Sequence, residues 1–292
     1  MPSIAFLTVA NQDEWVMDDV LAYTALRNAG WQLDEIVWDS DTDWDHYDIV
    51  AIRSPWDYQH RLEQFLKVLE RIENSSASLH NSLALVQWNI DKNYLFQLER
   101  EGIEIVPTHR LDQPTPDDVR QLFQHFDSAG VVLKPTVSAN ADDTFRIRPN
   151  TPDDELGDIC KIYSTKTCLA QPFMSGIIDE GEFSLIYFNG QLSHCIIKTT
   201  KQGDFRVQEE HGGGVIPLPQ PEAGLISAAE KVIAAIPELP LYARVDLVRT
   251  ETNRFALMEV ELIEPSLYFR FDENSPSAFA QSIDNRFTQT LS

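Results

Sequence analysis

Three acidic side chains interrupt an otherwise apolar stretch near the C-terminus, ARVDLVRTETNRFALMEVELIEP, which has the pattern of two β-strands joined by a turn. An antiparallel pairing about that turn aligns Asp246 with Glu259 and Arg244 with Glu261. Side chains along a strand alternate between its two faces, so all four are expected on one face of the hairpin. The pattern therefore predicts that three carboxylates and one guanidinium gather at one place.

This register assumes a turn centred at Thr252-Asn253 and also places Val248 and Leu257 on the acidic face. The opposite face is then a continuous apolar surface made of Val245, Leu247, Met258, Val260 and Leu262. A charged strand face is usually solvated, but the two apolar neighbours argue against a fully wet surface. Opposed like charges also destabilise a sheet unless a cation joins them, and hard cations such as Mg²⁺ take oxygen ligands. We therefore favour a metal site over a solvated face.

Four cations lie at or near the ends of predicted elements, where they could bind the phosphates of a nucleotide. Lys92 opens a helix, and backbone N–H groups at a helix start favour an anion. Lys134 follows the apolar run VVL, and lysine is rarely buried without a partner. Lys198 and Arg206 both belong to KTTKQGDFR. Each alone is explained as well by a surface cation whose stem covers apolar area, but together, in an acidic chain, they predict an anion site.

The elements that must position these residues begin with an alternation of strands and helices in the first eighty residues. Strands are predicted at 4–9, 33–38 and 48–53, with one helix ending at Gly30 and another at about 61–72. Such alternation indicates a parallel sheet, and ligands of parallel sheets bind beyond the carboxyl ends of the strands.

Arg53 and the segment SPWDY follow the third of these strands. A cation, the acid Asp57 and two aromatic side chains fit a zwitterionic substrate, and loops on rigid scaffolds often carry function. The alternative is that Trp56 and Tyr58 pack within the loop while Asp57 is a turn residue. The residues alone do not separate these two interpretations.

The rest of the chain continues with short elements. Helices are predicted at 91–102, after a Thr115 cap, at 152–163, at 224–236 and from Ser275, and strands at 103–108, 131–136, 144–148, 168–174 and in the hairpins 182–198 and 243–265. The Asn189-Gly190 turn is the strongest hairpin signal. The last helix is expected to bury Phe279, Ile283 and Phe287.

The formal net charge of −23 argues against a nucleic-acid partner, because phosphate backbones would be repelled. No apolar run is long enough to span a membrane, and MPSIAFLTVA lacks the features of a signal peptide. We therefore expect a cytoplasmic protein without membrane contact. Cys160, Cys168 and Cys195 have no metal-ligand spacing and are expected as buried free thiols.

The order of these features resembles the ATP-grasp superfamily of carboxylate–amine ligases, which includes glutathione synthetase and the alanine–alanine ligases. The resemblance covers about residues 81–265. It implies an α/β (α+β) ATP-grasp fold with a Rossmann-like pre-ATP-grasp substrate domain at 1–80, a central region with the small ATP-grasp subdomain at 81–174, and a large C-terminal subdomain with the metal site at 175–292. SPWDY, WNIDK, KPTVSA and EVELIEPSLY are most similar to the branch containing the ligase that closes ureido-serine to cycloserine.

The resemblance also implies roles for individual residues. The implied contacts are Gln171 and the backbone of Phe173 and Met174 with adenine, Glu182 with the ribose hydroxyls, Lys92 and Lys134 with the phosphates, and Asp246, Glu259 and Glu261 with Mg²⁺. KTTKQGDFR together with HGGG at 211–214 is similar to the flexible stretch that closes over an acyl phosphate.

The resemblance also implies three catalytic cations: Arg244, Arg206 and Lys198. The two arginines are expected to stabilise the acyl phosphate and the oxyanion that forms when an amine attacks. His211 and Gly213 are candidate substrate contacts. His211 fits a general base, although a loop histidine without a catalytic task fits the sequence as well.

Two positions depart from the family pattern. Glu261 stands where the family usually has Asn, and TVSANADD after Lys134 lacks the glycines of the phosphate-covering loop. The resemblance nevertheless implies ATP and two Mg²⁺ ions as cofactors, with Mn²⁺ as a substitute, an amino-acid- or peptide-like substrate, and a homodimer. The alternatives are an ATP-binding sensor or scaffold without turnover and a kinase-like transfer without ligation. The complete set of phosphate and metal residues favours the ligase.

Overall fold

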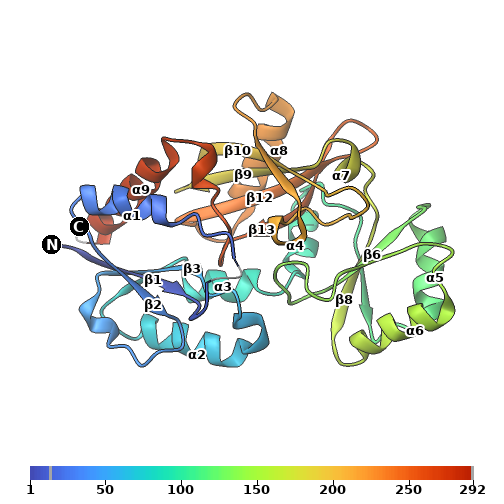
Figure 1. Cartoon of the computed structure of the whole chain (residues 1–292), viewed down its shortest axis with the longest axis horizontal. Coiled ribbons are helices and arrows are strands. Elements are labelled where there is room, and N and C mark those ends of the chain that lie inside the picture. Colours follow the sequence, from blue (N-terminus) through green and yellow to red (C-terminus); the bar gives the residue numbers. More distant parts are fainter. Residues whose placement is uncertain (13–14, 291–292) are drawn as a thin grey trace.

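The computed structural model describes residues 1–12 and 15–290. These residues form three sheets with strand orders β2-β1-β3-β4, β5-β8-β6-β7 and β11-β10-β9-β12-β13. In Figure 1 the first sheet lies below the third on the left, and the second lies on the right. Within the described ranges no helix has the length and apolar character needed to cross a membrane.

The N-terminal sheet is parallel, as the strand–helix alternation predicted. It contains β1 (Ser3–Thr8), β2 (Gln32–Val37), β3 (Ile49–Ser54) and β4 (Ser78–His80), with α1 (Val20–Asn28) and α2 (Leu62–Glu73). The predicted strands and helices agree with these bounds to within a few residues. Gly30 has φ +92°, a left-handed conformation that lets the chain turn after α1.

The central sheet lies at the opposite end of the molecule from both termini (Figure 1). It contains β5 (His109–Asp112), β6 (Val131–Pro135), β7 (Phe145–Ile147) and β8 (Thr167–Pro172), covered by α5 (Pro116–His125) and α6 (Asp153–Ile162). Thr115 caps α5 through a reciprocal hydrogen-bonded pair with Asp118, so the predicted cap is confirmed.

The predicted strand at 103–108 is wrong. Only an isolated bridge joins Ile105 to Leu257, and the strand of this region begins later, at His109. Ile105 and Val106 are buried against β13, and this burial explains the apolar pattern that suggested a strand. Two short helices precede this segment, α3 (Leu83–Asn89) and α4 (Tyr94–Arg100).

The C-terminal sheet is antiparallel throughout. It contains β9 (Glu182–Phe188), β10 (Gln191–Thr199), β11 (Gly214–Pro217), β12 (Tyr242–Arg249) and β13 (Phe255–Glu261), with α7 (Gly176–Asp179), α8 (Ala223–Ala235) and α9 (Ser275–Thr290). The predicted Asn189-Gly190 turn is confirmed, because Phe188 pairs with Gln191 and both turn residues have positive φ.

The C-terminal sheet also has two buried faces. One packs on α8, α3 and α4, and the other packs on α9 and the N-terminal sheet. On that second face the side chains of Ile4 and Phe6 share a core with those of Phe188 and Phe279. Phe279 and Ile283 are buried as predicted, while Phe287 is half-buried against Trp31. All three cysteines are free and buried, also as predicted.

Candidate active site

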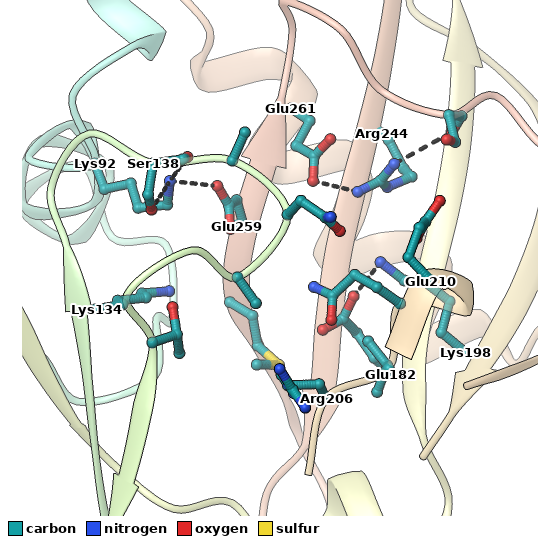
Figure 2. A pocket seen from close by; sticks show the side chains of 18 of the residues that line it. Lys92, Lys134, Ser138, Glu182, Lys198, Arg206, Glu210, Arg244, Glu259 and Glu261 are labelled. Carbon is teal, nitrogen blue, oxygen red and sulfur yellow. Dashed lines mark hydrogen bonds and ion pairs between the residues drawn. The ribbon is translucent and has the colours of Figure 1, made fainter. Parts of the chain in front are cut away.

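A cavity of about 230 Å³ lies where the three sheets approach one another. Its wall combines Lys134 of β6, Glu182 of β9, Glu259 of β13 and Trp56 from the loop after β3. Residues separated by more than two hundred positions in the chain therefore line one space. Figure 2 shows Lys92 and Lys134 on one side of Glu259, and Arg244, Lys198 and Glu182 on the other.

The acidic hairpin has the predicted register at its functional end. Asp246 pairs with Glu259 and Arg244 with Glu261. Nearer the turn, however, Leu247 pairs with Leu257, so Met258 is an extra residue in the ladder. Such a β-bulge makes two successive residues of one strand face a single residue of the other.

The bulge corrects two predicted orientations. Leu257 lies in the apolar core instead of on the acidic face, and Met258 lines the cavity instead of joining the core. Val248 packs near Met258, as its predicted face requires. The other predicted apolar residues are in the core: Val245, Leu247, Val260 and Leu262.

The outer edge of β13 is covered by side chains of the segment before and within α4. The Tyr94 hydroxyl accepts from the Val260 amide at 3.0 Å and donates to the Val260 carbonyl at 3.1 Å. The Asn89 side chain accepts from the Leu262 amide at 3.0 Å and donates to the Val260 carbonyl at 2.8 Å. These bonds satisfy edge groups that would otherwise be open, and they fix the strand that carries Glu259 and Glu261.

Asp246 lies behind the cavity wall, 2% exposed, with three partners. It accepts from Arg244 at 3.0–3.1 Å, from Lys198 at 3.2 Å and from Ser184 at 2.5 Å. Burial alone raises the pKa of Asp246, but the adjacent Arg244 and Lys198 outweigh it and lower this pKa to about 2. Asp246 is therefore an ionised carboxylate that holds two cations in place.

Glu261 and Glu182 both line the cavity, and each contacts a single cation. Glu261 pairs with Arg244, and Glu182 pairs with Lys198. Burial raises the pKa of Glu261 to about 7, aided by Asp246 and Glu259 and opposed by Arg244. Burial likewise raises the pKa of Glu182, although Lys198 opposes it. A further positive charge beside either acid would favour its ionised form.

Glu259 faces the two lysines predicted to hold phosphates. Lys92 Nζ lies 3.1 Å from Glu259 Oε1 and donates to the Ser138 carbonyl at 2.7 Å. Burial raises the pKa of Glu259, but Lys92 and Lys134 outweigh it and bring it below its usual value. Burial lowers the pKa of Lys134, whose ammonium has no carboxylate within ion-pair distance in the described chain.

A buried ammonium without an anion indicates an anion-binding site, so Lys134 supports the predicted phosphate contact. The predicted helix began at residue 91, but α4 begins at Tyr94, so Lys92 lies two residues before the helix instead of in its first turn. Its backbone amide donates to the Thr136 carbonyl at 2.8 Å, which joins it to the strand that carries Lys134.

The carboxylates do not form a closed metal site by themselves. Across residues 1–12 and 15–290 no group of three or more His, Cys, Asp or Glu side chains converges closely enough to hold a metal. Arg244 bridges Asp246 and Glu261, and Lys92 contacts Glu259. Glu259 and Glu261 are 28% and 30% exposed toward the cavity, and such hard oxygen donors fit Mg²⁺ bound jointly with phosphates.

The three residues with implied adenine contacts, Gln171, Phe173 and Met174, all line the cavity, but the structure changes one detail. Gln171 donates to the Thr108 hydroxyl at 2.9 Å, and the Phe173 amide donates to the Gly130 carbonyl at 2.8 Å. In the part of the chain that the structure describes, the Met174 amide has no such partner, so it is the better candidate for an adenine contact. Arg146 stacks over the Phe173 ring, 3.3 Å from its centroid.

Arg206 lines the cavity, and its guanidinium pairs with Asp204 at 2.7 Å. His211 and Gly213 do not line it. His211 Nε2 lies 3.4 Å from the Asn140 carbonyl, so two loops meet there. A Cβ on Gly213 would lie 2.2 Å from the Val207 carbonyl oxygen, which explains the glycine by close packing.

Arg53 and Asp57 also lie outside the cavity wall, so the structure does not place these two predicted residues with the others. Arg53 is 1% exposed and donates to Asp19 at 2.9 and 3.0 Å. Asp57 accepts from Trp38 and contacts Arg61. Their aromatic neighbours Trp56 and Tyr58 do line the cavity, together with residues that sequence reasoning missed: Trp15, Ser138, Gln208 and Glu264.

Comparisons with known proteins agree with this architecture. The family model described as "D-cycloserine synthetase DcsG, N-terminal domain" matches residues 4–81. The cycloserine biosynthesis protein DcsG of Streptomyces lavendulae is 27% identical over 274 residues, covering 90% of this chain and 91% of that protein.

Solved structures give the same result over nearly the whole chain. The crystal structure of D-cycloserine synthetase DcsG superposes with a TM-score of 0.84 at 26% identity, covering 98% of this chain and 99% of that one. The ATP-grasp ligase PsnB, solved with a minimal precursor, Mg and ADP, has a TM-score of 0.66 at 11% identity, covering 98% of each chain.

Fold, cavity and relatives together define this chain as an ATP-grasp ligase, an ATP-dependent enzyme that forms C–N bonds. Within that class it is a homologue of the cycloserine synthetase DcsG. The sequence-based prediction of the superfamily, and of the branch within it, is confirmed.

Proposed function

We propose that this ligase activates the carboxylate of a small amino-acid-like substrate as an acyl phosphate and couples it to an amine of the same molecule. The similarity to a cycloserine synthetase over 90% of the chain supports ring closure within one substrate. The observation that carries the proposal is the buried pair of ammonium groups, Lys92 and Lys134, facing Glu259 across one cavity.

The nucleotide is proposed to extend along this cavity from Met174 to Lys92 and Lys134. Adenine would contact the Met174 amide and the apolar side chains of Val106, Ile177 and Met258. Glu182 would accept from the ribose hydroxyls, and Lys92 and Lys134 would bind the phosphates. Each of these residues lines the cavity, so one bound nucleotide could reach all of them.

Glu259 and Glu261 are the residues that would hold Mg²⁺, with Asp246 behind them fixing Arg244 and Lys198. Two Mg²⁺ ions, with Mn²⁺ as a substitute, would offset the negative charge of the phosphates. Protein cations occupy the carboxylates in this structure, so nucleotide binding is expected to draw Lys92 from Glu259 toward the phosphates.

In the first step a substrate carboxylate oxygen attacks the γ-phosphorus, an acyl phosphate forms and ADP leaves. In the second step the amine attacks the acyl carbon, the C–N bond forms, and inorganic phosphate leaves with the bonding electron pair while the amine loses a proton. Arg244 and Arg206 are proposed to stabilise the negative charge that develops in both steps. The remaining task of the protein is to position the reactants and neutralise charge.

The release of ADP and phosphate tests this proposal. Purified protein with ATP and Mg²⁺ is expected to release both in equal amounts with ureido-serine or a related amino acid, and little with ATP alone. Nucleotide binding without turnover across a broad panel of amino acids would indicate a sensor instead. A phosphorylated product that never loses phosphate would indicate a kinase.

Three further assignments belong to the same proposal. The chain is proposed to divide into a substrate domain at 1–80, a central region at 81–174 and a C-terminal subdomain at 175–292. We also propose that it acts in the cytoplasm, where ATP is available and its free thiols stay reduced, and that it forms a homodimer. Sedimentation of the purified protein tests the last point.

A further inference from the structure

The N-terminal sheet contributes an aromatic wall to the cavity. β1 and β3 are adjacent and parallel, and the loops after their carboxyl ends carry Trp15 and Trp56. The two indole rings lie 5.0 Å apart between centroids, and both line the cavity together with Tyr58. Ligands of parallel sheets bind at the carboxyl ends of strands, so this wall is the natural place for the substrate.

Glu264 stands in this wall without a cation. The other half-buried or buried glutamates of the cavity each pair with one: Glu182 with Lys198, Glu209 with Arg270, Glu259 with Lys92 and Glu261 with Arg244. Among the described residues no lysine or arginine lies within ion-pair distance of Glu264, whose partner is the hydroxyl of the buried Tyr58. Glu210 lacks a cation too, but it is exposed to solvent.

The backbone at Glu264 is fixed by side chains of the RSPW segment. Trp56 Nε1 donates to the Glu264 carbonyl at 3.1 Å, and Arg53 donates to the Pro265 carbonyl at 3.0 Å. Arg53 is itself held by Asp19. The carboxylate is therefore preorganised, and Arg53 acts as a positioning residue and not as a substrate contact.

Burial and the nearby Glu261 raise the pKa of Glu264 to about 8, because the opposing effects of the Tyr58 hydroxyl and of Lys92 are smaller. A ligand cation at this position would favour the ionised carboxylate. The faces of the neighbouring tryptophans add to the attraction for an ammonium group.

We propose that Glu264 binds the ammonium group of the substrate against the aromatic wall of Trp15, Trp56 and Tyr58. This rests on the proposed function and names its substrate class more closely: a short-chain carboxylic acid that carries a primary amine. Glu264 then selects amino acids over otherwise identical acids without the amine.

Calorimetric binding to the intact chain, saturated with Mg²⁺ and a non-hydrolysable ATP analogue, tests this inference. The probes are both enantiomers of serine and of alanine, with 3-hydroxypropanoate and propanoate as their counterparts without an amine. Wild type is expected to bind at least one amino acid more than tenfold more tightly than its counterpart. Glu264→Gln is expected to weaken that binding by about 10- to 100-fold, the loss typical of a charged hydrogen-bond partner, and to leave the Kd of the ATP analogue unchanged.

Two further variants sharpen the result. Glu264→Asp keeps the charge and should retain the preference for the amine. It provides a second measurement of the role of the charge if the Glu264→Gln protein does not fold. Glu273→Gln, an exposed glutamate of the same C-terminal segment, should bind like wild type. Equal binding of acids with and without the amine, no binding of any probe, or wild-type affinity in a folded Glu264→Gln protein would overturn the inference. The ADP-release assay judges the proposed function separately, because it does not depend on which residue binds the amine.

Discussion

Replacing Glu259 by glutamine perturbs the centre of the site while keeping the shape of the side chain. The ion pair with Lys92 spans 3.1 Å, which corresponds to a gross attraction of about 5 kcal/mol at an effective dielectric constant of about 20. Lys92 keeps its bond to the Ser138 carbonyl at 2.7 Å, so its charge is not left without a partner. We therefore expect a net loss of only ~1–3 kcal/mol in the free energy of unfolding, and a Tm lower by a few degrees.

Turnover should fall far more than stability. If Glu259 holds Mg²⁺ against the phosphates, its loss removes an interaction that strengthens in the transition state, and we expect at least a 100-fold decrease in kcat, about 2.7 kcal/mol. ADP release with saturating ATP and Mg²⁺ measures kcat, and circular dichroism measures Tm. Glu251→Gln, on the exposed turn of the same hairpin, is the matched control and should behave like wild type. A cooperatively folded Glu259→Gln protein with turnover within threefold of wild type would refute the metal assignment.

Three other changes test separate parts of the structure. Lys134→Met removes a buried ammonium without a carboxylate partner, so it should raise the Kd for ATP at least tenfold while Tm stays equal or rises; unchanged ATP affinity in a calorimetric titration would contradict a phosphate role. Arg53→Met breaks a buried pair whose side chains are 2% and 7% exposed, and it should cost ~3–5 kcal/mol in urea unfolding, whereas a direct substrate contact would instead raise KM with little change in stability. Burial lowers the pKa of His80 to about 4 from 6.5, so the unfolded chain takes up a proton first as pH falls. The free energy of unfolding should then decrease by at most about 3 kcal/mol between pH 6.5 and 4, and His80→Gln should flatten that slope; an identical slope in both proteins would show that another group titrates.

The sequence predicted the pairing of Asp246 with Glu259, because the turn fixes the register and the acids alternate with apolar residues. It did not predict the bulge at Met258. The bulge gives no signal in the alternation of polar and apolar residues, because the residues around it, Ala256 to Met258, are all apolar and fit either face of the strand. The segment 103–108 misled for a related reason: Ile105 and Val106 are buried, but hydrophobicity alone does not say whether the covering partner is a ladder or a single bridge.

Residues at the proposed substrate end of the cavity were harder to predict than those at the proposed nucleotide end. Lys92 and Lys134 follow recognisable local patterns, whereas the role of Arg53 depends on Asp19 and Pro265, far away in the chain. Glu264 was within reach, since it continues the EVELIEP run three residues beyond Glu261. What identifies it is the lack of a cation within ion-pair distance among the described residues, and that is a property of the folded protein.

The extra residue in β13 separates two requirements that a regular strand would tie together. If Met258 were removed, Leu257 would still lie opposite Leu247 and Glu259 opposite Asp246, so neither the core nor the acids would have to move. The surface proposed to lie beneath the nucleotide base can thus be changed by substituting one residue, without disturbing the charged residues proposed to bind the phosphates.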